Sequence, residues 1–84
     1  MTANEVQDAV NDLIIELYRD HWEEFKHEPL NWGDLGCGEA REFKDGSWHV
    51  IIDEASPGEC PKFCTELEMR LRRRGINAGV HTEW

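Results

Sequence analysis

The stretch "EAREFKDGSWHVIID", residues 39–53, decides the fold because it predicts a β-hairpin in the middle of the chain. Its Asp45-Gly46 dipeptide is a preferred two-residue hairpin turn. Residues with strong strand preference alternate behind that turn, namely Trp48, Val50 and Ile52. Two adjacent antiparallel strands follow from this pattern.

The turn type also predicts the register of the hairpin. A type I′ turn at Asp45-Gly46 pairs Phe43 with Trp48, Glu42 with His49 and Arg41 with Val50. The expected core side carries Phe43, Trp48, Val50 and Ile52. The opposite, solvated side carries Glu42, His49 and Ile51.

Upstream of the hairpin, residues 2–26 predict one long amphipathic helix. Apolar side chains recur there at steps of three and four, namely Val6, Val10, Leu13, Ile14, Leu17, Tyr18, Trp22 and Phe25. Thr2 and Glu5 have capping-box spacing, and Pro29 disfavours helical geometry at the preceding residue. Residues 29–38 are rich in glycine and are expected to form a loop.

Downstream of the hairpin, a second helix has two candidate starts. Ser56 has the position of an N-cap before Pro57, and Pro61 offers a later first turn. Gly75 is expected to end this helix in the left-handed conformation. Residues 77–84 then alternate like a final strand, with Ala78, Val80, Thr82 and Trp84 on one side.

The expected fold is therefore α+β, with elements in the order α-β-β-α-β. A short chain builds one hydrophobic core, so residues 1–84 are read as a single domain. Because a β-helix-β crossover is right-handed when its strands are parallel in one sheet, both helices can cover one face of a three-stranded sheet. The prediction is a two-layer sandwich, with the last strand beside either the second strand or the first.

Charge restricts the classes of partner. The chain holds 18 acidic and nine basic residues, giving a net charge of −9. This charge opposes direct binding to nucleic acid and to anionic membranes, and it favours proteins with a basic surface. No apolar run is long enough to cross a bilayer and the N-terminus lacks signal-peptide features, so a cytoplasmic location is expected.

The cysteines and histidines define an alternative function. Cys60 and Cys64 lie four apart on one helical face and, with a histidine, suggest a metal or redox site. A second polar group is expected on the outer sheet face, formed by Glu42, His49, His81 and Glu83. Buried thiols and a solvated sheet surface explain both patterns, so no metal ligand, cofactor or catalytic residue is assigned.

The first helix carries more negative charge than its stability requires. Residues 1–28 hold eight acids against Arg19 and Lys26, and like charges at helical spacing destabilise a helix. We therefore expect a non-enzymatic, regulatory or inhibitory protein-binding module. The expected binding residues are Asp8, Asp12, Glu16, Asp20, Glu23, Glu24, Trp32 and Trp84.

Carboxylates one helical turn apart, about 6 Å, resemble the phosphate spacing of one nucleic-acid strand. The helix would then compete for a basic groove, as phage-encoded inhibitors do. Two other possibilities remain open. The face could serve solubility alone, or the chain could self-associate as a homodimer through its sheet. The arginines at residues 70–74 are expected to face the acids of the first helix, with Glu66–Arg70 and Glu68–Arg72 as helical pairs.

Overall fold

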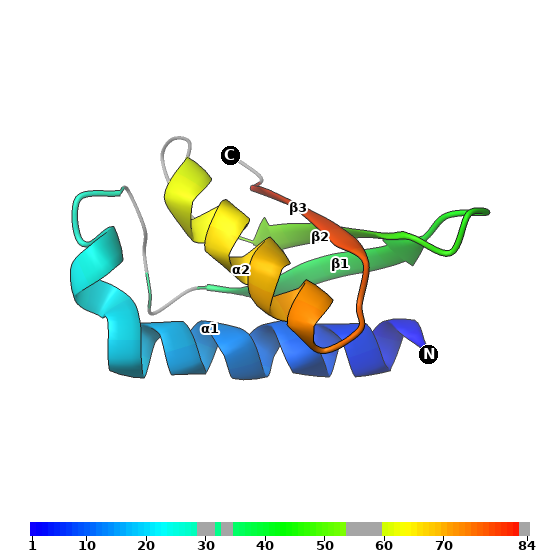
Figure 1. Ribbon diagram of the computed structural model, residues 1–84, viewed down its shortest axis with the longest axis horizontal. Coiled ribbons are helices and arrows are strands. Elements are labelled where there is room, and N and C mark those ends of the chain that lie inside the picture. Colours follow the sequence, from blue (N-terminus) through cyan, green and yellow to red (C-terminus); the bar gives the residue numbers. More distant parts are fainter. Residues whose placement is uncertain (29–31, 33–34, 54–59, 83–84) are drawn as a thin grey trace.

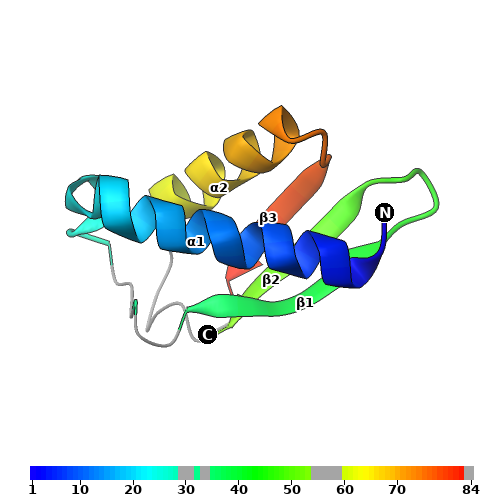
Figure 2. The ribbon, with the colours of Figure 1, turned by 90° about the horizontal axis from the view of Figure 1, so that it is seen from below.

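The computed structural model describes residues 1–28, 32, 35–53 and 60–82. The elements follow the expected order, α1(Ala3–Phe25), β1(Gly36–Glu42), β2(Trp48–Asp53), α2(Pro61–Arg73) and β3(Ala78–Thr82). Both helices lie on one side of the three-stranded sheet, which confirms the two-layer α+β architecture (Figures 1 and 2). Neither of the two described helices covers the opposite face of the sheet.

The sheet order is β1-β2-β3, which settles where the last strand lies. β1 and β2 are antiparallel, and β3 runs parallel to β2 after the α2 crossover. α1 packs mainly over β1 and α2 mainly over β3, while the two helices also contact each other. β1 and β3 are therefore the edges of the sheet.

α1 begins at the predicted capping box. Thr2 Oγ1 accepts from the backbone N–H of Glu5 at 3.2 Å, and the Glu5 carboxylate accepts from the N–H of Thr2 at 2.9 Å. Hydrophobic side chains on one face of α1 are buried, namely Val6, Val10, Leu13, Ile14, Leu17 and Phe25. Tyr18 and Trp22 were expected in this stripe but are exposed, so the buried face is narrower than the periodicity predicted.

The predicted hairpin register is wrong by one residue. Glu42 pairs with Trp48, Arg41 with His49, and Ala40 with Val50. The loop is wider than a two-residue turn, since Phe43 N–H donates to the Ser47 carbonyl and Gly46 N–H to the Phe43 carbonyl. The cause is local. The Asp45 carboxylate accepts from the Ser47 N–H at 2.9 Å, and Gly46, the one glycine of the loop, takes a φ of 86°.

The new register changes what lies on each face. Trp48, Val50 and Ile52 are buried under the helices, as predicted. Phe43 is 47% exposed and lies on the uncovered face, not in the core. Glu42 lies opposite Trp48 instead of His49, which removes it from the predicted polar group.

α2 uses the later of its two predicted starts, at Pro61, while Ser56 lies outside the described residues. The N-cap residue, Cys60, makes no capping bond with its side chain. The helix is capped instead by Glu28, whose carboxylate accepts from the N–H groups of Lys62 and Phe63 at 2.8 and 3.0 Å. Gly75 ends the helix with a φ of 84°, as expected.

The exposed edge of β3 is partly occupied by a side chain of α2. Glu68 Oε1 accepts from the backbone N–H of Val80 at 2.7 Å. This bond uses the carboxylate that the sequence assigned to a pair with Arg72. The bond also occupies a backbone N–H on an edge strand. A free N–H at such an edge could otherwise pair with a further strand.

Candidate functional site

The six acids predicted to bind a partner do not form one equivalent surface. Three of them pair with Arg or Lys of the same chain, namely Glu16, Asp20 and Glu23, and Glu24 lies within hydrogen-bond distance of His21. Asp8 and Asp12 are exposed, and neither makes an ion pair within the described part of the chain. These two carboxylates, one helical turn apart, are the ones available to a second molecule.

Glu16 belongs to a network that joins the two helices. The Arg70 guanidinium, whose side chain is 14% exposed, donates to Glu16 and also to Glu66 at 2.9 Å. It lies 2.9 Å from Nε2 of His21, and Arg74 lies 4.0 Å from Glu16. The predicted opposition of α1 acids and α2 arginines, and the Glu66–Arg70 pair, are confirmed.

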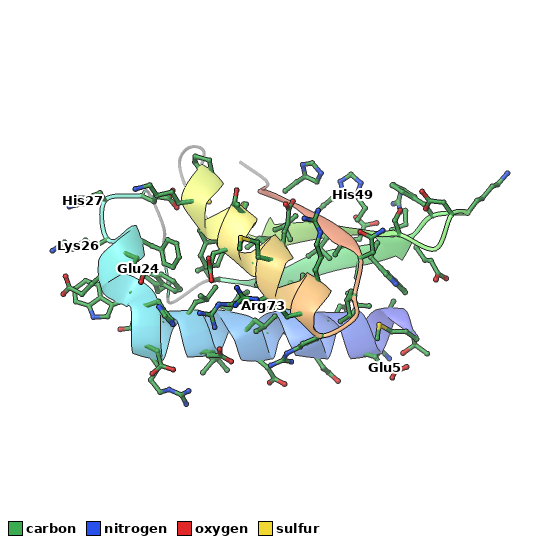
Figure 3. All side chains as sticks on the ribbon, viewed as in Figure 1. Glu5, Glu24, Lys26, His27, His49 and Arg73 are labelled. Atoms are coloured by element: carbon green, nitrogen blue, oxygen red, sulfur yellow. The ribbon has the colours of Figure 1, made fainter. Side chains whose placement is uncertain are left out.

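Arg73 contributes to the same interhelical region. It extends from α2 on the side that faces α1 (Figure 3). A hollow there is lined by Leu13, Glu16, Arg70, Arg73 and Arg74. Glu16 therefore faces a cluster of arginines of its own chain, which leaves it poorly placed to meet a basic partner.

The other engaged acids form local pairs at the surface. Arg19 donates to Asp20 at 3.0 Å, which lowers the pKa of the Asp20 carboxyl and raises the pKa of the guanidinium. Lys26 lies 2.9 Å from Glu23, and His21 lies 3.2 Å from Glu24. Exposed pairs of this kind contribute little stability and yield readily to a competing charge.

Trp32 closes one end of the core. Its ring centroid lies 5.2 Å from Tyr18, 6.4 Å from Phe25 and 5.4 Å from Phe63. In this half-buried packing the tryptophan caps a small core, which leaves less of its ring for a partner. Trp84, the other predicted aromatic contact, lies outside the described residues.

Beside Trp32, α1 exposes an apolar group that the sequence pattern did not predict. Ile15, Tyr18 and Trp22 are 62%, 53% and 45% exposed. A hollow of about 340 Å³ lies against the first two, lined by Asn11, Ile14, Ile15, Tyr18, Trp32 and Leu35. The position of Ile15 outside the predicted buried stripe could have indicated its exposure. Tyr18 and Trp22 were predicted to lie in that stripe, so their exposure was not expected.

The apolar group and the unpaired acids share one side of the helix. Asp8, Asp12 and Ile15 follow each other at steps of four and three, and Tyr18 and Trp22 continue at three and four. We define these five residues as the α1 docking face. It combines large apolar side chains, which gain free energy when covered, with carboxylates free to meet cations.

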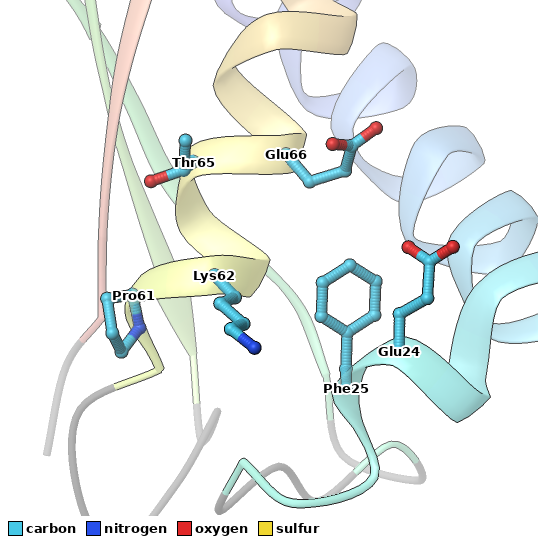
Figure 4. Close-up of a pocket in the computed structure, with 6 residues that line it drawn as sticks. All are labelled: Glu24, Phe25, Pro61, Lys62, Thr65 and Glu66. Atoms are coloured by element: carbon cyan, nitrogen blue, oxygen red, sulfur yellow. The ribbon is translucent and has the colours of Figure 1, made fainter.

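A second hollow, of about 440 Å³, lies between the C-terminal end of α1 and the start of α2 (Figure 4). It is lined by Glu24, Phe25, Pro61, Lys62, Thr65 and Glu66. The Glu66 carboxylate is bound by Arg70 and Glu24 by His21, while Lys62 brings a positive charge. Its charges are largely compensated within the chain, so it offers weak selectivity for an ion of either sign.

The cysteine pair occupies the start of α2 without the other ligands of a metal site. Cys60 is buried and Cys64 half-buried. A hydrogen bond between the thiols lowers the pKa of Cys60 and raises that of Cys64, where burial adds to the rise. Across the described residues, no group of three or more His, Cys, Asp or Glu side chains is arranged to hold a metal ion.

Half of the predicted polar group on the open sheet face is present. His49 and His81 lie with their ring centroids 4.3 Å apart. Glu42 has moved away through the change of register, and Glu83 lies outside the described residues. The two imidazoles are joined on this face by Phe43, whose ring meets His49 edge-on at 5.5 Å.

Comparisons with protein-family models, with curated proteins and with solved structures find no match. None of the helices in the described ranges has both the length and the apolar character needed to cross a membrane. The evidence for function is therefore the chemistry of the protein's own surfaces.

Proposed function

We propose that the protein is a binding module that docks on another protein through the α1 docking face. One observation carries this proposal, namely that three large apolar side chains remain exposed beside two unpaired carboxylates on one side of α1. The other acids of α1 are bound within the chain, Glu16, Asp20 and Glu23 by Arg or Lys, Glu24 by His21 and Glu5 in the helix cap. The α1 docking face therefore combines carboxylates without an ion pair and apolar side chains without a covering group among the described residues.

The partner's chemistry follows from this composition. It presents Lys or Arg side chains to Asp8 and Asp12, next to an apolar group that covers Ile15 and Trp22. Fully covering one large apolar side chain contributes roughly 1.5–3 kcal/mol. A net charge of −9 speeds the encounter with a basic surface, while the apolar contact determines how long the complex lasts.

A basic groove that normally binds nucleic acid has the required chemistry. Asp8 and Asp12 stand one helical turn apart, about 6 Å, which is comparable to the phosphate spacing of one strand. The protein would act there by occupation and not by catalysis, as an inhibitor in the cytoplasm. Of the six predicted α1 acids, only Asp8 and Asp12 lack a partner among the described residues, so the apolar contact supplies the affinity that charge alone does not.

The test uses single substitutions with matched controls. Asp12→Lys is paired with Glu42→Lys, because both reverse one exposed carboxylate but only the first lies on α1. Ile15→Ser is paired with Met69→Ser, because Met69 is also exposed but lies on α2. Wild type and variants are used as bait in extract from the source cells, and bound proteins are quantified by mass spectrometry.

The proposal expects one protein that wild type and both controls retain and both α1 variants lose. Its binding is then measured with purified components, where each α1 variant weakens affinity by about tenfold or more. Weaker binding of that protein in high salt is also expected. A partner that binds Asp12→Lys and Ile15→Ser as well as it binds wild type would overturn the proposal, and so would the absence of any retained protein.

A further inference from the structure

The parallel pairing of β2 with β3 brings two histidines together on the uncovered face of the sheet. His49 lies opposite Gly79, and His81 lies opposite Ile51, so the two histidines are diagonal neighbours. His49 points to the side of the sheet away from α1 (Figure 3). His81 is exposed and His49 half-buried, so a small ion can reach both rings.

Gly79 leaves the position opposite His49 without a side chain. A side-chain carbon added at Gly79 would lie 3.9 Å from Nε2 of His81, so that nitrogen lies over the position directly opposite His49. A larger residue at this position would occupy the space between the rings. Phe43 packs edge-on against the far side of His49 and limits the directions in which that ring can turn.

The spacing of the rings suits two cis ligands on one metal ion. With a metal–nitrogen distance of about 2.0–2.1 Å, the metal lies about 3.2 Å from each ring centroid. Two imidazoles at roughly 90–110° on one metal then have centroids about 4.5–5.2 Å apart. The observed 4.3 Å lies just below this range, so binding one ion requires the two tilted rings to move slightly apart.

The charges around the pair permit a cation to bind. Arg41 lies opposite His49 on β1, but its guanidinium is bound by the Glu39 carboxylate at 2.5 Å. The net charge of −9 attracts cations to the molecule as a whole. Imidazole nitrogens are good ligands for nickel, copper and zinc ions and poor ones for calcium or magnesium.

We propose that His49 and His81 form a two-histidine chelate for a divalent late transition metal on the open face of the sheet. Among the described residues no third ligand lies beside the pair, so the remaining coordination positions are open to water or to another molecule. The site is independent of the α1 docking face, and its failure would leave the proposed function untouched.

The probe is Ni²⁺, titrated into the reduced full-length protein and followed by calorimetry and by ¹H–¹⁵N NMR. We expect one ion per chain, with paramagnetic broadening centred on residues 49–51 and 79–81. His49→Gln and His81→Gln should each weaken binding by about tenfold or more, because each removes one of two ligands. Gly79→Val should also weaken it by crowding the rings.

His27→Gln is the matched control, because His27 is exposed at the end of α1, away from the sheet. Its affinity should equal that of the wild type. Circular dichroism of every variant verifies that the fold is kept. Broadening centred on Cys60 and Cys64 or on the N-terminus would overturn the proposal, as would equal affinity in the His49→Gln variant or no binding at about 1 mM metal.

Discussion

Glu28 caps a helix that begins 33 positions later in the chain: its Oε2 accepts from the backbone N–H of Phe63 at 3.0 Å, and its Oε1 accepts from the N–H of Lys62 at 2.8 Å. Cys60, the residue in the N-cap position, makes no such bond with its side chain. The carboxylate therefore satisfies two of the free donors of α2 and fixes the start of α2 to the end of α1.

Replacing Glu28 with Ala should lower the free energy of unfolding by about 1–2 kcal/mol, the usual cost of losing a helix cap. Glu28→Gln keeps one acceptor oxygen and should lose less. Urea unfolding followed by tryptophan fluorescence measures both. Glu24→Ala is the control, since Glu24 is an exposed acid at the same end of α1, and a loss as large as that of Glu28→Ala would contradict the capping role.

Arg70 should be the most important charged residue for holding the two helices together. Removing its side chain takes away the cation that Glu16 and Glu66 share, and leaves Glu16 only the longer contact with Arg74. Because both carboxylates stay partly exposed, Arg70→Ala should cost about 1–3 kcal/mol and not the full penalty of a buried unpaired charge. Arg72→Ala, an exposed neighbour, should change stability by no more than about 0.5 kcal/mol.

Equilibrium unfolding in urea distinguishes these two arginines. If Arg70→Ala were as stable as Arg72→Ala, the interhelical network would contribute nothing measurable to the free energy of unfolding. Glu16 would then become a candidate for partner binding again, because its carboxylate would be free to leave Arg70. A measured loss in Arg70→Ala instead keeps Glu16 assigned to the fold.

The sequence was sufficient to predict features that depend on neighbouring residues. The capping box of Thr2 and Glu5 and the left-handed Gly75 depend on residues within one helical turn, and both are present. The order of elements and the two-layer architecture follow from periodicity and chain length. Among the candidate binding residues, Asp8 and Asp12 were predicted as exposed acids and are exposed.

Features that depend on distant parts of the chain were not predictable in this way. The cap from Glu28 requires knowledge of where α1 and α2 meet. Periodicity places Tyr18 and Trp22 on the apolar side of α1, but it does not say how far the sheet extends beneath them. The hairpin register depended on the Asp45 side chain, which binds Ser47 and competes with the two-residue turn that the dipeptide suggests.

The hairpin register can be tested by comparing two aromatic residues. In the structure Trp48 is buried under the helices and Phe43 is exposed on the open face. Trp48→Ala should therefore cost about 3–5 kcal/mol, whereas Phe43→Ala should cost less than about 1 kcal/mol. Chemical denaturation gives both values, and comparable losses would indicate the register in which the two rings share the core.

The same hairpin predicts a specific effect of acid. The Ser47 hydroxyl, at 2.6 Å, and the Ser47 N–H, at 2.9 Å, donate to the Asp45 carboxylate and hold its pKa below the usual range, the hydroxyl being the larger cause. A carboxyl with a lower pKa in the folded state contributes stability above its unfolded pKa of about 3.9. That contribution is lost as the pH falls through the folded pKa.

Ser47→Ala removes the hydroxyl donor and keeps the backbone N–H, so the pKa of Asp45 should rise toward its usual value without fully reaching it. Asp45→Asn cannot ionise and should remove this part of the acid dependence while keeping an acceptor for the Ser47 N–H. Carboxyl NMR titration gives the pKa, and thermal unfolding from about pH 3 to about pH 7 gives the stability. An unchanged pKa in Ser47→Ala would mean that the hydroxyl does not bind the carboxylate in solution, and the side-chain part of the turn would have to be revised.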